Sequence, residues 1–259
     1  MPPRGLEPSG LLLVDKPAGP SSFQVIAAIR RRTGARTGHA GTLDPFASGL
    51  LLVLSGAATR LTPWLVGLDK RYVTDVQLGS RTSTGDPEGD VVGTTEPPSE
   101  PALRERLAEL RGEVELPVPA ASAVKIGGER AYRLHRRGEM VEMPLRRSRV
   151  GMLDLVSYSD AIARLDLRVG SGTYVRSIAD ALGGHCRALR RLEVGPFSVE
   201  DADEERIVPA AEAVPFLPAV EVDADEAAAI RSGRRHAVAD TRTIHEGALV
   251  AVGRVVMPG

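Results

Sequence analysis

The stretch from Gly38 to Leu54 constrains the fold of this chain more than any other. It opens as a polar loop punctuated by three glycines and continues into the apolar run 50–54. A short, wholly apolar run of this kind predicts a buried strand. Pro45 biases Asp44 away from helical geometry. An acid on a stiff turn at the mouth of a buried strand is a candidate for chemistry, although Asp-Pro is also typical of an ordinary turn.

The composition excludes several classes of site. The chain has 259 residues with a single cysteine, Cys186, and five histidines that show no metal-ligand spacing. An internal disulfide and a multi-cysteine metal site are therefore excluded, and the cysteine usage fits a reducing compartment. The N-terminus lacks an apolar signal core, and no apolar run approaches membrane-spanning length. We expect a cytoplasmic protein that binds neither a membrane nor a metal.

The net charge of −1 conceals segregated patches of opposite sign. Residues 130–149 hold seven arginines against two glutamates, and further arginines cluster at 30–36 and 187–191. Residues 200–226 hold ten acidic residues against Arg206. Basic patches suit a polyanion, although each one taken singly also fits a solvated face.

Hydrophobic periodicity predicts strands and helices that alternate irregularly. We expect strands at 11–14, 50–54, 70–79, 113–118, 147–157 and 162–169, and helices opening at Ser21, Ala57, Ser99 and Ser171 and covering 209–216. Short links between neighbouring strands favour an α+β fold with a mixed, largely antiparallel central sheet flanked by helices. The composition shifts at residue 217, which divides the chain into a catalytic domain, 1–216, and a small C-terminal domain, 217–259.

The familiar catalytic motifs are absent. The chain carries no P-loop, dinucleotide-binding fingerprint, nucleophile elbow or H-E-x-x-H zinc motif. A carboxylate enzyme or a binding module remains. Tyr72 opens an alternating strand, and Tyr174 and Arg176 project from the first turn of a predicted helix. Because a cation is unfavourable at a helix N-terminus, we expect Arg176 to face a carboxylate and pair with it in a bidentate manner.

Five motifs, in order across roughly residues 10–200, make the chain resemble the TruB family of tRNA pseudouridine-55 synthases. They are Val14-Asp15-Lys16-Pro17, Thr37 to Pro45 running on through Gly49-Leu50-Leu51, Lys70-Arg71-Tyr72, Ser171-Gly172-Thr173-Tyr174-Val175-Arg176, and Leu189-Arg190-Arg191-Leu192. The resemblance implies a pseudouridine synthase fold and conversion of uridine 55 in the tRNA T-loop to pseudouridine. In that isomerisation the N1–C1′ bond breaks, the base turns and C5 joins C1′, without any cofactor or metal.

The resemblance also implies roles for individual residues. Asp44 is the essential carboxylate, which either attacks C1′ or removes the C2′ proton, and Arg176 is its ion-pair partner. Tyr72 stacks on the target uracil, Tyr174 lies at its other side, and Leu192 packs in the pocket wall. A stacked uridine has to be flipped out of the T-loop to reach the aspartate. His39 resembles the histidine that fills the gap left by the base.

The same resemblance implies an RNA-gripping insertion at about 119–147. Lys125 and Arg136 follow at family-like spacing, whereas Ala121 stands where the family usually has Tyr. Phosphate contacts are predicted for Lys16, Arg190, Arg191 and the basic segment 130–149. The C-terminal domain would be a short or truncated PUA-like domain. We expect a monomer whose partner is the T-arm stem-loop of tRNA.

Two alternatives stay open. One is a non-catalytic RNA-binding protein on the same scaffold, and the other is a synthase that acts on a different RNA. Asp44, Tyr72, Tyr174 and Arg176 together argue against the first, because a binder has no need of a carboxylate near phosphates.

Overall fold

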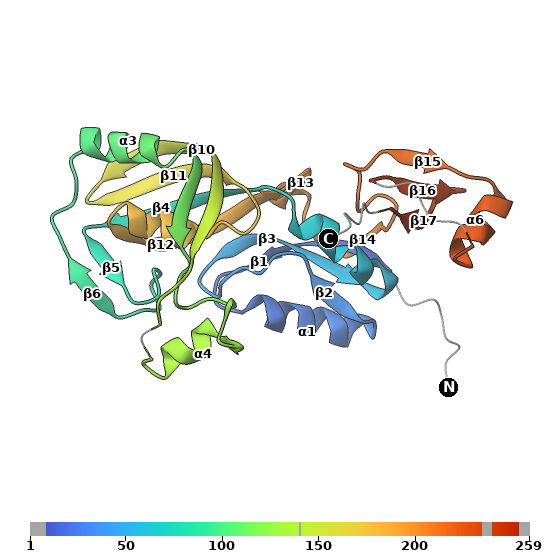
Figure 1. The fold of residues 1–259 in the computed structure, drawn as a ribbon, viewed down its shortest axis with the longest axis horizontal. Coiled ribbons are helices and arrows are strands. Elements are labelled where there is room, and N and C mark those ends of the chain that lie inside the picture. The colour runs from blue at the N-terminus through green and yellow to red at the C-terminus, as the bar shows by residue number, and fades with distance from the viewer. Residues whose placement is uncertain (1–8, 140, 235–239, 254–259) are drawn as a thin grey trace.

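The computed structural model describes residues 9–139, 141–234 and 240–253 (Figure 1). Its main feature is a ten-stranded mixed sheet. Eight strands follow one another across it: β14 (Asp203–Pro209), β1 (Gly10–Lys16), β3 (Ser48–Ser55), β12 (Gly184–Val194), β4 (Lys70–Leu78), β11 (Ile162–Val169), β10 (Leu145–Ser159) and β7 (Gly112–Pro117). The short strands β2 (Thr37–His39) and β13 (Phe197–Ser198) pair with β3 and β12. Among the described strands of this sheet only β3 and β12 run parallel, so the expected α+β fold with a largely antiparallel sheet is confirmed.

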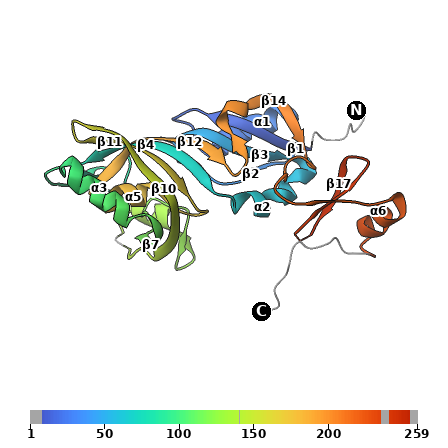
Figure 2. The same ribbon diagram turned by 90° about the horizontal axis from the view of Figure 1, so that it is seen from above.

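The sheet has two halves with separate cores (Figure 2). In one half, α3 (Glu100–Glu109) and α5 (Val175–Ala181) pack with β4, β10, β11 and β12. In the other, α1 (Ser22–Thr33) lies beside β1, β2 and β3. Strand β12 pairs with β4 along most of its length but meets β3 only at Arg190–Ser48 and Arg191–Gly49. This narrow junction is where the two halves of the molecule meet.

Local sequence signals explain the elements that carry the site. Ser21 caps α1 through a complete capping box with Gln24, and Gly34 ends the helix in the left-handed conformation, as predicted. Strand β4 buries every second residue, starting at Lys70 and including Tyr72. The helix expected from Ala57 is a 3₁₀ turn, η1 (Gly56–Leu61), followed by the short α2 (Thr62–Val66).

The central strand β12 was not predicted from the sequence. Its buried positions are Gly184, Cys186, Leu189, Arg191 and Val194, which are separated alternately by two and three residues. Two β-bulges, at Arg187 and Leu192, insert the extra residues. The strict alternation by which a strand is recognised in a sequence is therefore absent.

The predicted helix at 209–216 is wrong. Strand β14 runs through Pro209, and turns follow it, with the amide of Ala213 donating to the carbonyls of Pro209 and Ala210. Pro215 disfavours helical geometry at Val214, which prevents the turns from continuing as a helix. The helix predicted from Ser171 likewise starts later, with Tyr174 as its N-cap residue.

Three smaller units complete the described chain. A hairpin of β5 (Ser80–Thr82) and β6 (Val91–Thr94) follows β4. The insertion between β7 and β10 holds β8 (Lys125–Ile126), β9 (Glu129–Arg130) and α4 (Ala131–Arg136). A separate sheet of β15 (Ala219–Glu221), β16 (Arg242–His245) and β17 (Ala248–Val252), with α6 (Ala224–Arg231), lies at the end of the chain. Within the described residues, no helix combines the length and apolarity needed to cross a membrane.

Candidate active site

Asp44 lies on the loop that joins β2 to β3, at the junction of the two halves of the sheet. The carbonyl of Pro45 accepts hydrogen bonds from the amide of Gly19, at 2.8 Å, and from Nζ of Lys16, at 3.3 Å. Ser22 Oγ lies 2.9 Å from both the amide and the carbonyl of Leu43. The loop is therefore fixed to the first turn of α1 and to the segment before it.

Lys16 holds this loop from within the protein. Its side chain is fully buried, and Nζ also donates to the carbonyls of Pro17, at 2.8 Å, and Pro20, at 2.7 Å. Because the side chain is enclosed and its three hydrogens are directed at carbonyls, the predicted phosphate contact is wrong for Lys16. Its role is structural.

Arg191 is a second predicted phosphate contact that the structure places in the interior. Its guanidinium donates to the carbonyls of Leu50, at 2.7 Å, and Gly41, at 3.0 Å, and the side chain is almost completely buried. The bulge at Leu192 turns this strand so that Arg191 lies beneath the Asp44 loop. Arg191 therefore supports the loop rather than reaching the surface.

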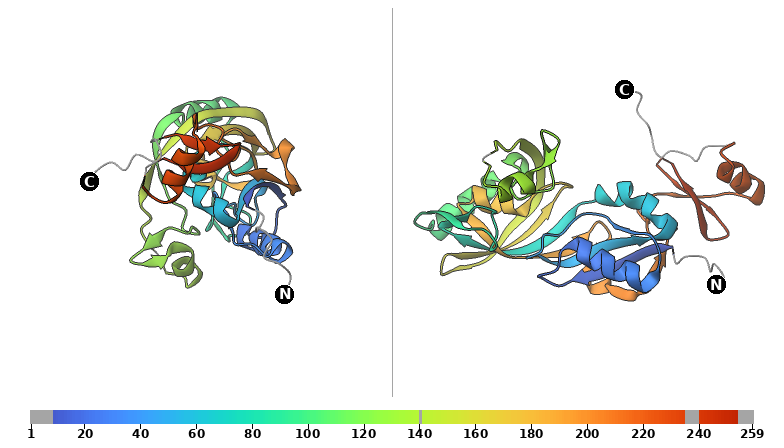
Figure 3. Two further views of the ribbon diagram at one scale, coloured as in Figure 1. Left: turned by 90° about the vertical axis from the view of Figure 1, so that its right-hand side faces the viewer. Right: turned by 90° about the horizontal axis from the view of Figure 1, so that it is seen from below.

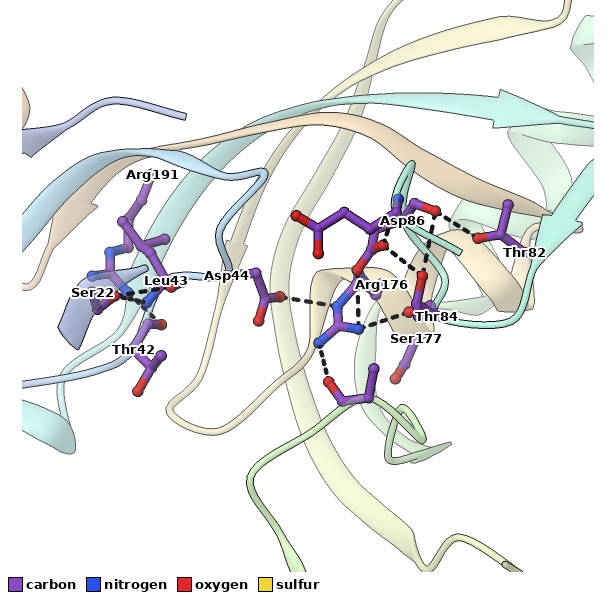
Figure 4. A network of polar contacts seen from close by, with 12 residues as sticks. Ser22, Thr42, Leu43, Asp44, Thr82, Thr84, Asp86, Arg176, Ser177 and Arg191 are labelled. Atoms are coloured by element: carbon purple, nitrogen blue, oxygen red, sulfur yellow. Dashed lines mark hydrogen bonds and ion pairs between the residues drawn. The ribbon is translucent and has the colours of Figure 1, made fainter. Parts of the chain in front are cut away.

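Arg176 approaches Asp44 from the other half of the sheet. Its Nε lies 2.9 Å from Asp44 Oδ2, and its side chain is only 3% exposed (Figure 4). The Nε hydrogen is not aligned on the carboxylate, so the contact is an ion pair rather than a well-formed hydrogen bond. The predicted pairing of these two residues is confirmed, but the predicted bidentate geometry is wrong. The terminal nitrogens of the guanidinium point elsewhere.

Those terminal nitrogens tie Arg176 to two further segments. Nη1 donates to the carbonyl of Thr84 at 2.7 Å, and Nη2 donates to the carbonyl of Ala121 at 3.0 Å. Ala121 stands where the resemblance implies a tyrosine, yet its main chain reaches the buried guanidinium. The insertion is therefore joined to the site through a backbone contact that does not depend on the side chain at this position.

Asp86 is a second acidic partner of Arg176 that the sequence did not indicate. Its Oδ2 lies 3.3 Å from Arg176 Nη1, and its side chain is buried. Thr84 Oγ1 donates to Oδ1 at 2.5 Å, and the amide of Glu88 donates to the same oxygen at 3.0 Å. A short polar loop between strands gives no hydrophobic periodicity from which this burial could be read.

The surroundings of Asp44 shift the pKa of its carboxyl group in opposite directions. Burial raises the pKa of the Asp44 carboxyl above its ordinary value, and the Asp86 carboxylate raises it further, while Arg176 and Lys16 lower it. One third of the side-chain surface is still exposed, 34%, so the carboxylate can meet a molecule from solvent. A half-enclosed carboxylate beside a buried guanidinium is suited to act as a base or a nucleophile.

Comparisons with known proteins show which family the chain belongs to. Residues 30–175 match the model of the TruB family pseudouridylate synthase, N-terminal domain. The chain belongs to this family. The tRNA pseudouridine synthase B of Leifsonia xyli subsp. xyli is 43% identical over 83% of this chain and 77% of its own length. That of Gluconacetobacter diazotrophicus is 39% identical over 92% of this chain and 85% of its own length.

Solved structures agree on the fold. A chain of a Cbf5-Nop10-Gar1 complex superposes with a TM-score of 0.68 and 25% identity, over 93% of this chain and 76% of the other. A chain of an H/ACA RNP bound to a substrate RNA containing 2′-deoxyuridine gives a TM-score of 0.67 at 23% identity, with the same coverage. The predicted pseudouridine synthase fold is confirmed.

Three apolar or aromatic residues of the TruB-family site were predicted to surround the uracil. Tyr72 lies in the core cluster that also contains Leu43, and 8% of it is exposed. Tyr174 is half-buried at the start of α5, two residues before Arg176. Leu192 is half-buried at the second bulge of β12. Their contacts with a base stay predictions.

His39 ends β2, five residues before the catalytic candidate of this TruB-family chain. It is half-buried, and its Nδ1 is enclosed without a hydrogen-bond partner among the described residues. Burial lowers the pKa of the imidazole, and the charge of Arg191 adds to the effect. Both effects favour the neutral form of the ring.

The remaining predicted RNA contacts are at the surface of this TruB-family chain. Lys125 on β8 and Arg136 on α4 are exposed, and the Arg136 guanidinium lies 5.7 Å from the centre of the Tyr132 ring. Arg190 is half-exposed and paired with Asp15 at 2.7 Å. Unlike Lys16 and Arg191, these three cations are open to solvent.

A cavity beside Arg176 and the lack of a metal-binding cluster in the described residues further define the site. A cavity of about 190 Å³ lies between Arg176, the Thr84 loop and the segment of the insertion around Pro119, but Asp44 does not line it. The cavity reaches the site only through Arg176, which lies 2.9 Å from Asp44. Within the described residues, no group of three or more His, Cys, Asp or Glu side chains is placed to hold a metal ion.

Proposed function

We propose that this TruB-family chain converts uridine 55 in the T-loop of tRNA to pseudouridine, with Asp44 as the essential carboxylate. The observation that carries the proposal is the ion pair between Asp44, half-exposed on the motif loop, and the buried Arg176. Relatives named tRNA pseudouridine synthase B are 43% and 39% identical to this chain, which supports tRNA as the substrate.

A single carboxylate is enough for the isomerisation, because all bonds and protons are accounted for in either of two routes. In one route Asp44 attacks C1′ as N1 leaves with the bonding electrons, and C5 then displaces the carboxylate. In the other route Asp44 removes the C2′ proton as N1 leaves, and the proton returns to C2′ when C5 joins C1′. In both routes C5 finally loses its proton and N1 gains one, so no electrons enter or leave. Both require an ionised carboxylate.

In this proposal each neighbour of Asp44 has a task. Arg176 holds the carboxylate in place and keeps it ionised against the effect of burial. Tyr72 stacks on the flipped uracil, Leu192 lines the pocket wall, and Tyr174 lies near the proton that leaves C5. His39 occupies the gap that the extruded base leaves in the loop.

Binding is assigned to exposed cations rather than buried ones. Lys125, Arg136 and Arg190 are the phosphate contacts in our proposal, with the insertion gripping the RNA. Residues 1–216 act as the catalytic domain, and 217–259 as a short PUA-like domain. In this proposal the chain acts in the cytoplasm and as a monomer, with Asp44 and Arg176 supplied by the same chain.

The experiment compares Asp44→Asn with the matched variant Asp154→Asn on a T-arm stem-loop RNA. We expect Asp44→Asn to abolish turnover while the Kd changes little, and Asp154→Asn, which alters only an exposed ion pair with Arg111, to remain active. Full activity of Asp44→Asn would refute the assignment. Binding by the wild type without any turnover would favour the non-catalytic alternative.

A second measurement tests the substrate. Pseudouridine is mapped at nucleotide resolution in tRNA from cells that lack the protein. Loss of the modification at position 55 supports the T-loop assignment. An intact position 55, with loss elsewhere, would show that the chain is a synthase for a different RNA.

A further inference from the structure

Phe23 is the most exposed large apolar side chain in the described part of the chain, with 71% of its surface open to solvent. It lies in the first turn of α1, and the adjoining Ser22 and Ile26 are buried. Aromatic residues make up only 3% of this sequence, and burial of a phenylalanine is normally favourable. An exposed ring at this position therefore needs an explanation.

The backbone at Phe23 is rigidly connected to the catalytic loop. Ser22 Oγ is hydrogen-bonded to both backbone polar groups of Leu43, the residue before Asp44. Standard bond lengths then place the Cα atoms of Phe23 and Asp44 within about 15 Å of each other. α1 begins at the end of the sheet where Lys16 pairs with Gly49, which is also the end that carries the Asp44 loop. The ring is therefore within reach of an RNA segment that binds at Asp44.

The same face of α1 carries unpaired positive charge. Arg30 lies seven residues after Phe23, so it shares the face of the helix about 10 Å farther along. Arg30 and Arg31 are exposed and form no ion pair within the described residues, whereas Arg32 is paired with Glu204 and Glu205. α1 and α4 project from the same side of the molecule (Figure 3). On α4, the guanidinium carbons of Arg133 and Arg136 lie 5.9 Å and 5.7 Å from the centre of the Tyr132 ring.

We propose that Phe23 is a stacking platform for an unpaired nucleobase next to the target uridine, with Arg30 holding a phosphate of the same strand. This inference rests on the proposed function and names a further contact of its substrate. Single-stranded RNA is recognised by aromatic rings on which bases stack and by cations that follow the backbone. A lone ring with unpaired arginines two turns farther along the same helix fits that chemistry better than a protein interface, which needs a larger apolar patch.

The first test separates stacking from simple apolar contact. Phe23 is changed to Ala, Leu and Trp, and Val156→Ala, at a residue on β10 that is 59% exposed, serves as the control. We expect the Kd for a T-arm stem-loop to rise about tenfold in Phe23→Ala and Phe23→Leu, and to stay within about twofold in Phe23→Trp and Val156→Ala. Equal affinity of the wild type and Phe23→Ala, or full rescue by Leu, would overturn the proposal. Because Phe23 is exposed, these variants are expected to fold, which a thermal melt verifies.

The second test separates positioning from catalysis and from the proposed function. At saturating RNA, the single-turnover rate of Phe23→Ala should match that of the wild type, because the ring does not touch the reacting atoms. Arg30→Gln should reduce the dependence of log Kd on log salt by about 0.7, the amount of one single-strand phosphate contact. An unchanged slope would remove Arg30 from the proposal. If the wild type binds the stem-loop and Phe23→Ala weakens that binding, but neither isomerises it, the proposed reaction fails while the platform stands.

Discussion

Gly49 lies directly against the main chain of Arg191 at the only place where β3 and β12 pair. A Cβ atom at position 49 would stand 2.2 Å from the carbonyl oxygen of Arg191, and the glycine has a φ of +104°. Both facts exclude any other residue here without a shift of the backbone. This contact closes the junction above which the Asp44 loop is held.

Gly49→Ala should therefore lower the free energy of unfolding by about 2–4 kcal/mol, because strain at positive φ adds to a clash with backbone. Gly19→Ala is the matched control, since Gly19 has a φ of +108° but nothing within 4 Å of its Cβ position. It should lose only about 1 kcal/mol. Urea denaturation measures both. Equal losses would mean that the contact with Arg191 contributes nothing.

Arg176→Lys tests the guanidinium that Asp44 faces. A lysine keeps the charge but cannot reach Asp44, Asp86, the Thr84 carbonyl and the Ala121 carbonyl together. We expect the single-turnover rate at saturating RNA to fall about 100-fold or more, with a modest change in Kd. An unchanged rate would mean that Arg176 does not position the carboxylate.

The pKa of Asp44 predicts the pH dependence of the reaction. Because the pKa is raised and the ionised form is needed, kcat/KM should fall on acidification through a value above the ordinary range of Asp. Asp86→Asn removes a charge that raises this pKa, so the acid limb should move to lower pH. Asp154→Asn, which removes an exposed ion pair with Arg111, should leave the profile where it is. A profile unmoved by Asp86→Asn would contradict the coupling of the two carboxylates.

Lys16→Met removes three hydrogen bonds to carbonyls without changing the length of the side chain greatly. We expect a loss of about 2–4 kcal/mol in the free energy of unfolding, because buried carbonyls lose charged donors. Lys125→Met, at an exposed position, should leave stability unchanged and weaken RNA binding. If Lys16→Met were fully stable but reduced the salt dependence of binding, its assignment to the interior would be wrong.

Two buried cations show why part of the site could not be read from the sequence. Lys16 and Arg191 belong to basic motifs, and a lysine or arginine in such a motif is ordinarily at the surface. Their burial is possible because main-chain carbonyls from segments distant in sequence accept their hydrogen bonds. These carbonyls come together only when β1, β3 and β12 assemble. A carbonyl belongs to every residue, so no side-chain pattern indicates where it will accept a hydrogen bond.

The sequence alone determined those elements whose formation depends on neighbouring residues. Helix caps and hydrophobic periodicity predicted the capped helix α1, the alternating strand β4 and the buried strand β3, because both signals act over a few residues. The linear motifs also indicated Asp44 and Arg176. Only the tertiary structure decided that Asp86 faces the same guanidinium, that the Ala121 carbonyl reaches it, and that Phe23 stays exposed beside the loop. The first two are contacts between segments far apart in the chain, which no local sequence pattern encodes.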